Sequence, residues 1–125
     1  MGRIGLQLEK AVPQGDSKTL LERAKLANAA LFLLRGGPTL YYGDEKGMIG
    51  TGGDRDARQD MFPTQVEDWK TETRIGQSPI GAQSSFDVQN PLHLQITELQ
   101  KIIAANPGLR YGNQQVQNTE NGLLV

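Results

Sequence analysis

The stretch GGPTLYYGDEKG, residues 36–47, decides how the rest of the sequence is interpreted. Two glycines and a proline precede four residues, 39–42, that include a β-branched side chain and two aromatic ones. Such residues favour a β-strand, and an apolar run without strict alternation is typical of a strand covered on both faces in a parallel sheet. Glycine, aspartate and glutamate follow directly. The stretch therefore predicts a short buried strand that ends in an acidic loop.

The residues before this stretch predict a helix over 17–34. Asp16 or Ser17 can cap its first turn. Apolar residues follow at the spacing of one helical face, at Leu20, Ala24, Ala27, Leu31 and Leu34. Three more apolar residues, Ala30, Phe32 and Leu33, widen this surface, so we expect the last turns to be buried on most sides. A helix that leads into a buried strand is half of a βαβ unit.

A second helix is predicted over residues 90–106. Asn90 is a favourable N-cap residue, and Pro91 stands at the first helical position, where proline is common. Its apolar stripe consists of Leu92, Ile96, Leu99 and Ile103. More than forty residues rich in Gly, Asp, Gln, Ser and Pro separate this helix from the predicted strand. A connection of that length in a compact domain is expected to be either functional or disordered.

The tail after residue 108 predicts two short strands around a turn at Asn121 and Gly122. The order of elements is then helix, buried strand, long loop, helix and hairpin. One parallel strand cannot form a sheet without neighbours, and no other stretch offers a convincing long buried strand. The sequence is therefore interpreted as a piece of a larger domain.

Composition excludes several classes of partner. Thirteen Lys and Arg oppose fourteen Asp and Glu, for a formal charge of -1, so no electrostatic field attracts nucleic acid or an anionic membrane. The longest apolar run, residues 29–34, is far shorter than the roughly 20 residues that span a bilayer. There is no cysteine for a disulfide or a thiolate metal site. A neutral ligand suits this charge balance best, and nothing in the composition indicates a cellular compartment.

One pattern in the sequence consists of Gly36, Pro38, Tyr41, Gly43 and Glu45. It resembles the signature around the eighth strand of the (β/α)8 barrel in a known family, the α-amylase family of glycoside hydrolases. The family's D-x-x-x-R-x-x-M pattern in the following loop resembles Asp54, Arg58 and Met61. Residues 106–112, NPGLRYG, resemble the segment that closes the last barrel helix. Residues 1–5, MGRIG, resemble the residues directly after the family's Asn-His-Asp motif.

The resemblance implies a fold and an activity. Residues 1–108 would be an α/β fragment of a TIM (β/α)8 barrel, with helix 7, strand 8, a long loop and helix 8. Residues 109–125 would begin an all-β C-terminal domain and break off in its second strand. The parent enzyme would act on an α-linked glucan or oligosaccharide with retention, through two carboxylates and a covalent glycosyl intermediate. Its catalytic carboxylates would precede Met1, so we expect the chain alone to be inactive and the upstream part of the barrel to be its partner.

The resemblance also implies the residues that contact sugar. Asp54 and Arg58 are the first candidates, because a guanidinium held by a carboxylate presents fixed donors to hydroxyl groups. A purely structural ion pair is an equally good interpretation of the same two residues. Arg3 occupies the place of an arginine near the family's stabilising aspartate and is assigned to the same substrate site. In the chain by itself, Arg3 is expected to be a mobile surface side chain.

Tyr42, Asp44 and Glu45 are expected to lie at the rim of the site, because barrel enzymes build their sites from loops that follow the strands. Glu45 is predicted to accept hydrogen bonds from the loop backbone. No carboxylate of this loop is assigned to catalysis. Trp69 and Phe62 could stack on a sugar ring, although a tryptophan that fixes its own loop is equally common.

The remaining motifs predict no cofactor. GMIGTGGD, residues 47–54, lacks the G-K-[ST] of a phosphate loop, and residue 55 is arginine where the dinucleotide fingerprint needs glycine or alanine. DRDARQ, residues 54–59, lacks the third acidic ligand and the glycine of an EF-hand, so an irregular calcium site stays open and is not predicted. His93, with no nucleophile motif nearby, is expected at the surface.

Two alternatives remain open at this point. One is a family member without catalysis that binds carbohydrate or serves as an accessory subunit. The other is a small independent α/β module that binds a ligand through GTGGDRD, residues 50–56. The sequence does not indicate which α-linked sugar is used or whether hydrolysis or transfer prevails.

Overall fold

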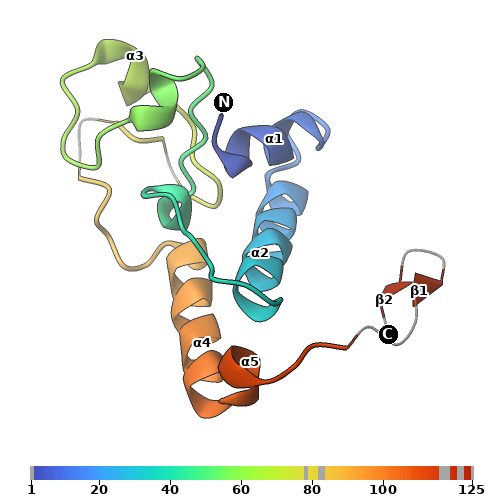
Figure 1. The fold of residues 1–125 in the computed structure, drawn as a ribbon. Helices are drawn as coiled ribbons and strands as arrows, with labels where there is room; N and C mark the ends of the chain where they lie inside the picture. Colours follow the sequence, from blue (N-terminus) through green and yellow to red (C-terminus); the bar gives the residue numbers. More distant parts are fainter. Residues whose placement is uncertain (1, 78, 82–83, 116–118, 121–122, 125) are drawn as a thin grey trace.

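The structure is a computed structural model of the 125-residue chain, and it describes all residues except 1, 78, 82–83, 116–118, 121–122 and 125 (Figure 1). Five α-helices, two 3-10 helices and two strands are formed by the described residues. They are α1 (Ile4–Lys10), α2 (Ser17–Leu33), η1 (Asp44–Lys46), η2 (Asp56–Arg58), α3 (Glu67–Lys70), α4 (Pro91–Ala105), α5 (Gly108–Tyr111), β1 (Thr119–Glu120) and β2 (Leu123–Leu124).

The core lies where α1, α2 and α4 meet two segments of the long loop. Figure 1 shows α2 and α4 side by side, with α1 near the first turns of α2. The buried apolar side chains of this core are Leu6, Ala24, Ile49, Ile75 and Leu92. Loop residues thus complete a core that the helices alone leave open, and this fixes the loop that carries the candidate site.

Helix α2 confirms the predicted helix and its cap. The carboxylate of Asp16 accepts a hydrogen bond from the amide of Thr19 at 3.0 Å, which satisfies one of the free donors of the first turn. The expectation that its last turns are buried is wrong. Leu31 and Leu34 are exposed, because among the described residues the helix packs mainly through Ala24 and Asn28, nearer its middle.

Helix α4 confirms the second predicted helix. Asn90 caps it by accepting a hydrogen bond from the amide of Leu92 at 2.8 Å, and Pro91 is its first residue. Three residues of the predicted stripe, Leu92, Ile96 and Leu99, are buried. The sequence predicts this element well because cap, proline and stripe are all local signals.

The predicted buried strand over residues 39–42 is not formed. Residues 39–41 have no regular secondary structure and Tyr42 lies in a turn. Tyr41 and Tyr42 are 43% and 42% exposed. A strand must pair its backbone with a neighbouring strand, and no described segment forms such a strand beside residues 39–42. The strand and barrel part of the predicted α/β fold is therefore not confirmed, although the helices on either side are.

The long loop is an ordered structure in its described residues. It contains η1, η2 and α3, and two isolated bridges join Met48 to Arg74 and Arg74 to Gln77. Met48, Ile49 and Ile80 are fully buried. The loop is thus built on its own apolar anchors, in addition to the contacts with the helices.

The tail forms the short helix α5 and then an antiparallel pair of strands, with Thr119 opposite Leu124 and Glu120 opposite Leu123. These two-residue strands lie within the stretch for which a hairpin was predicted, while the predicted turn residues 121 and 122 lie outside the described residues. The assignment of residues 109–125 to a separate β domain stays a prediction.

Helix α1 was not predicted from the sequence. Its buried residues are Gly5 and Leu6, and an ideal Cβ atom at Gly5 would lie 3.0 Å from the carbonyl oxygen of Met48. The helix therefore approaches the loop backbone closely at this glycine. None of the helices among the described residues has the length and apolar character needed to cross a bilayer.

Candidate functional site

Arg3 is a deeply buried charged residue of the candidate site. Arg3 is 3% exposed. Its Nη1 donates hydrogen bonds to the carbonyl oxygen of Tyr42 and to Oδ1 of Asp44, the latter at 2.9 Å. Nη2 lies 3.9 Å from Sδ of Met48. The expectation of a mobile surface arginine is therefore wrong, because the residue before α1 lies directly against the turn formed by residues 41–48.

Two tyrosine rings cover this guanidinium. Its Cζ atom lies 4.7 Å from the ring centroid of Tyr41 and 5.0 Å from that of Tyr42, and the two centroids are 4.8 Å apart. Arginine over an aromatic face is an attractive arrangement that strengthens as water is excluded. Burial raises the pKa of the Tyr42 phenol, the neighbouring Tyr41 adds to this, and the charge of Arg3 opposes it.

Asp44 is held between burial and the charge of Arg3. Burial raises the pKa of the Asp44 carboxyl, while the hydrogen bond and the charge of Arg3 lower it, and the net direction is upward. Nearby Glu45 also raises it. The ion pair thus compensates only part of the cost of removing this carboxylate from water.

Glu45 folds back on its own turn. Its Oε2 accepts a hydrogen bond from the amide of Gly43 at 2.8 Å. This is the kind of contact that the sequence predicted for Glu45. Its position at the rim of a sugar site stays a prediction.

Asp54 and Arg58 come together as an ion pair, with their side chains 67% and 66% exposed. Asp54 lies just before η2 and Arg58 is the last residue of η2, so a spacing of four residues in the sequence already indicated the contact. An exposed pair of this kind contributes only about 0 to 1 kcal/mol to stability. The structure therefore brings the first two candidate residues together and presents them to solvent.

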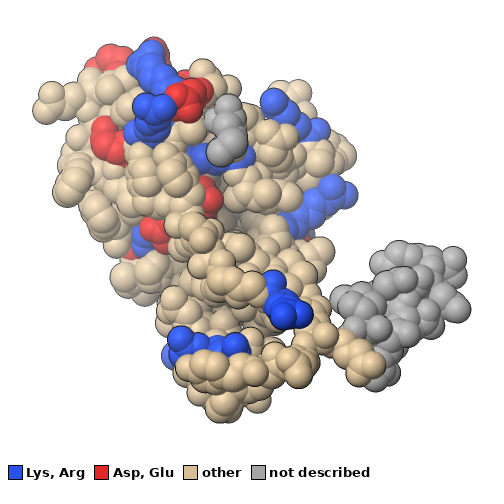
Figure 2. All heavy atoms as spheres, in the orientation of Figure 1, with Lys and Arg blue, Asp and Glu red and all other residues tan. Residues whose placement is uncertain are grey.

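Trp69 fixes the loop that carries this pair. Its Nε1 donates a hydrogen bond to Oδ1 of Asp56 at 2.9 Å, and the guanidinium of Arg55 lies 5.7 Å from the centre of its ring. Arg55 also lies 3.7 Å from the carboxylate of Asp68. Figure 2 shows acidic and basic side chains gathered over this end of the molecule, where α3 lies. Of the two interpretations of Trp69, the structure supports the loop anchor.

Replacing Trp69 with phenylalanine tests this anchor. The ring volume is largely kept, but the hydrogen bond to Asp56 is lost, so we expect a loss of about 1 kcal/mol in the free energy of unfolding. Limited proteolysis should then cut residues 50–58 faster than in the unchanged chain. Equal stability and equal cleavage in both proteins would contradict the anchor role.

The structure also shows two residues of the site that the sequence did not indicate. Lys46 is buried, and its carbonyl oxygen accepts a hydrogen bond from Nδ2 of Asn90 at 3.0 Å. His93 is half-buried, with Nδ1 3.1 Å from Nζ of Lys46, so the expectation of a surface histidine is wrong. Both contacts join residues more than forty positions apart, and no local pattern signals them.

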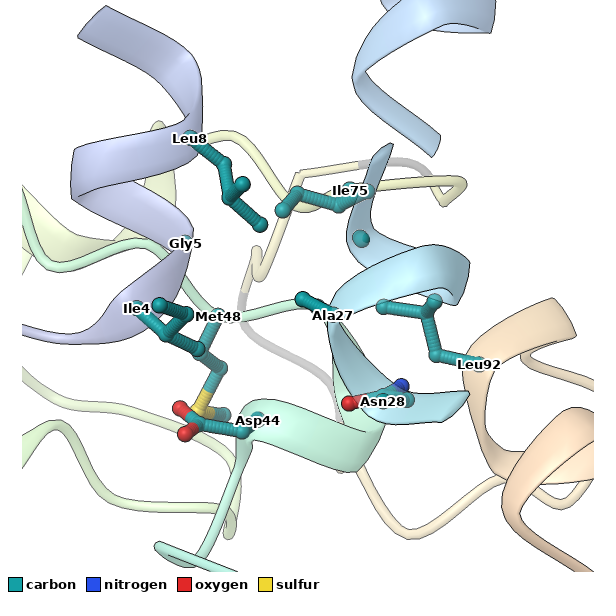
Figure 3. A pocket seen from close by; sticks show the side chains of 11 residues that line it. Ile4, Gly5, Leu8, Ala27, Asn28, Asp44, Met48, Ile75 and Leu92 are labelled. Carbon is teal, nitrogen blue, oxygen red and sulfur yellow. The ribbon is translucent and has the colours of Figure 1, made fainter. Parts of the chain in front are cut away.

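A small cavity borders Asp44 and Met48, which contact Arg3, and a larger groove lies elsewhere on the described part of the chain. The smaller, of about 20 Å³, is drawn in Figure 3. It is lined by Ile4, Gly5, Leu8, Ala24, Ala27, Asn28, Asp44, Gly47, Met48, Ile75 and Leu92. Figure 3 shows the Asp44 carboxylate beside Met48 at one end. This volume holds about one water molecule and no sugar ring.

The larger cavity is an open groove of about 580 Å³ between the end of α1, the start of α2 and residues 73–77. Neither cavity is lined by Asp54 or Arg58. Among the described residues no group of three or more His, Asp and Glu side chains is arranged to hold a metal ion. In this chain the predicted sugar-contacting pair is therefore an exposed surface feature.

The sequence of this chain is similar to that of a known enzyme. The chain is 40% identical over 122 residues to an alpha-amylase of Streptomyces lividans. The match covers 98% of this chain and 13% of that protein. No family model matches the chain, and no solved structure matches it.

Identity at this level over nearly the whole chain relates it to the glycoside hydrolases. More specifically, the chain corresponds to a fragment of an alpha-amylase family protein. This confirms the resemblance drawn from the sequence. It also removes the basis for an unrelated small α/β module that binds a ligand through residues 50–56.

Proposed function

We propose that this chain supplies part of the α-glucan site of an α-amylase family glycosidase or transglycosylase. The observation that carries the proposal is the identity of 40% to an alpha-amylase over 98% of the chain. An α-amylase acts on α-linked glucan, so the same substrate class is proposed here. The sugar would be a neutral polyhydroxy ligand, which agrees with the balanced charge of the chain.

Asp54 and Arg58 are the proposed sugar contacts. Their exposed ion pair presents guanidinium donors in a fixed direction, and Trp69 holds the loop through Asp56. Arg3 is proposed to belong to the same site. Because its guanidinium is buried against Tyr42 and Asp44, it acts by holding these rim residues rather than from the surface.

The proposed chemistry of the parent enzyme is retaining, with one carboxylate as nucleophile and another as acid. We assign neither role to this chain. Its candidate carboxylates have other partners: Asp44 pairs with Arg3, Asp54 with Arg58, and Asp56 accepts from Trp69. The chain by itself is expected to be inactive, with the rest of a barrel as the partner that brings the catalytic pair.

A segment exchange tests this function. The aligned segment of the Streptomyces lividans alpha-amylase is replaced by this chain, and hydrolysis of soluble starch by the chimera is measured. We expect an active chimera, in which D54A or R58A lowers kcat/KM about 10-fold to 100-fold, since a hydrogen bond to a charged group contributes about 1.5 to 3 kcal/mol.

The matched control is K101A, which removes an exposed ion pair of α4 with Glu98. It should leave kcat/KM nearly unchanged. A chimera that folds and is active, but in which D54A and R58A have no more effect than K101A, would contradict the assignment of these two residues. A folded chimera that binds maltooligosaccharide without hydrolysing starch would instead support the non-catalytic alternative, a carbohydrate-binding or accessory member of the family.

A further inference from the structure

Lys46 is a buried cation for which no ion pair is found among the described residues. Lys46 is 3% exposed, and its Nζ donates a hydrogen bond to the carbonyl oxygen of Asp87. The same Nζ lies 3.1 Å from Nδ1 of His93. A lysine ammonium has donors only, so a hydrogen bond between these two atoms requires Nδ1 of His93 to accept. Such a bond forms only with a neutral imidazole that carries its proton on Nε2.

The same end of α4 also holds the main chain of Lys46. Asn90, which is fully buried, donates from Nδ2 to the carbonyl oxygen of Lys46 at 3.0 Å, while its Oδ1 caps the helix. Lys46 is the last residue of η1, the turn that also contains Asp44 and Glu45. Two residues at the start of α4 thus hold this turn. Asn90 bonds to the backbone of Lys46, and His93 contacts the side chain of Lys46.

No carboxylate that would stabilise a protonated imidazole pairs with His93 among the described residues. From η1 the facing group is the Lys46 ammonium, and the nearby loop contributes Asp87, whose carboxylate lies 3.9 Å from the guanidinium of Arg74. From α2, Asn28 and the carbonyl oxygen of Lys25 both bond to Gln95 of α4, and neither of these groups carries a charge. Among the described residues, no carboxylate forms an ion pair with His93.

We propose that His93 is a positioning residue that holds the Asp44 and Glu45 turn only while its imidazole is neutral. Protonation removes the acceptor at Nδ1 and places a second cation beside the buried Lys46 ammonium. The bond is then lost, and the turn loosens from α4 in acid. The effect of this on a sugar site rests on the proposed function, whereas the contact between η1 and α4 does not.

The test uses the full chain and two substitutions. H93N keeps an acceptor near the position of Nδ1 but cannot be protonated, and K46M removes the donor. Thermal unfolding is followed by circular dichroism at pH 7.5 and at pH 5.0, on either side of the value near 6.5 where histidines ordinarily titrate. We expect the midpoint of the unchanged chain to fall about 4 °C further than that of H93N, which corresponds to about 1 kcal/mol for a chain of this length. K46M should lose the same excess pH dependence.

A second measurement stays informative if H93N does not fold. In the unchanged chain, nitrogen NMR should show the Nε2–H tautomer at neutral pH, and the amides of Lys46 and Gly47 should shift along the same titration curve as the imidazole. An Nδ1–H tautomer, or amides that ignore the titration, would overturn the proposal. So would identical pH profiles for the unchanged chain and a folded H93N. An inactive chimera in the starch assay would contradict only the proposed function, because these measurements need no substrate.

Discussion

Replacing Arg3 with methionine is expected to lower the free energy of unfolding by about 3 to 5 kcal/mol, the usual cost of breaking a buried ion pair from one side. The guanidinium is inaccessible to solvent, and the side chain of its partner Asp44 is only 12% exposed. Methionine would fill much of the volume but would leave that carboxylate without its cation. It would also remove the charge that Tyr41 and Tyr42 cover. Urea unfolding followed by circular dichroism measures the loss.

The matched control is R58M, which breaks the exposed pair with Asp54. That change should cost at most about 1 kcal/mol, because solvent screens both charges. A double variant, R3M with D44L, should recover part of the loss, since no unpaired carboxylate would remain buried. Equal losses in R3M and R58M would mean that the Arg3 cluster does not contribute to folding as its burial indicates.

The pH dependence of the R3M penalty has a defined sign. Burial raises the pKa of Asp44 even with Arg3 present, and removing that charge leaves burial unopposed. Below the unfolded value of about 3.9 the carboxyl is neutral in both states, so it adds no cost there. The cost grows as pH rises above that value and is complete once pH exceeds the raised folded value. The difference in stability between the unchanged chain and R3M should therefore be smaller at pH 4 than at pH 7.

The two long helices could be predicted from the sequence because their signals are local. Asp16 and Asn90 are caps that bond within three residues, and each is followed by an apolar stripe. The buried strand over residues 39–42 failed for the opposite reason. Its residue types favour a strand, but a strand forms only beside another one, and that neighbour is not among the described segments. The exposed rings of Tyr41 and Tyr42 are the result.

In the candidate site too, the contacts between residues close in sequence could be predicted and those between distant residues could not. The contacts of Glu45 with Gly43 and of Asp54 with Arg58 span two and four residues, and the sequence predicted both. Arg3 reaches Asp44 across forty-one positions, and Lys46 reaches His93 across forty-seven. Such pairings follow from how the loop packs on the helices, and a single sequence contains no periodicity that would indicate them.

Replacing Gly47 with alanine is the second change for which we expect a large loss, about 3 kcal/mol or more, in the range reserved for strained or overpacked sites. Its φ of 72° is disfavoured for any residue with a Cβ atom. The added atom would also lie 2.3 Å from the carbonyl oxygen of Ile75 and 2.8 Å from its amide nitrogen. Neither backbone atom can move easily, because the amide of Ile75 donates to the carbonyl oxygen of Gly47 at 2.8 Å.

G53A separates the two causes of this loss. Gly53 has a φ of 95°, but an ideal Cβ atom there meets nothing within 4 Å. It should therefore cost only the conformational part, about 1 to 2 kcal/mol. Urea unfolding of both variants gives the difference, which measures how tightly the backbone at Ile75 is held against the end of η1. If G47A costs no more than G53A, residues 73–77 yield to the added methyl group, and the turn that carries Asp44 and Glu45 is fastened by Arg3 and α4 alone.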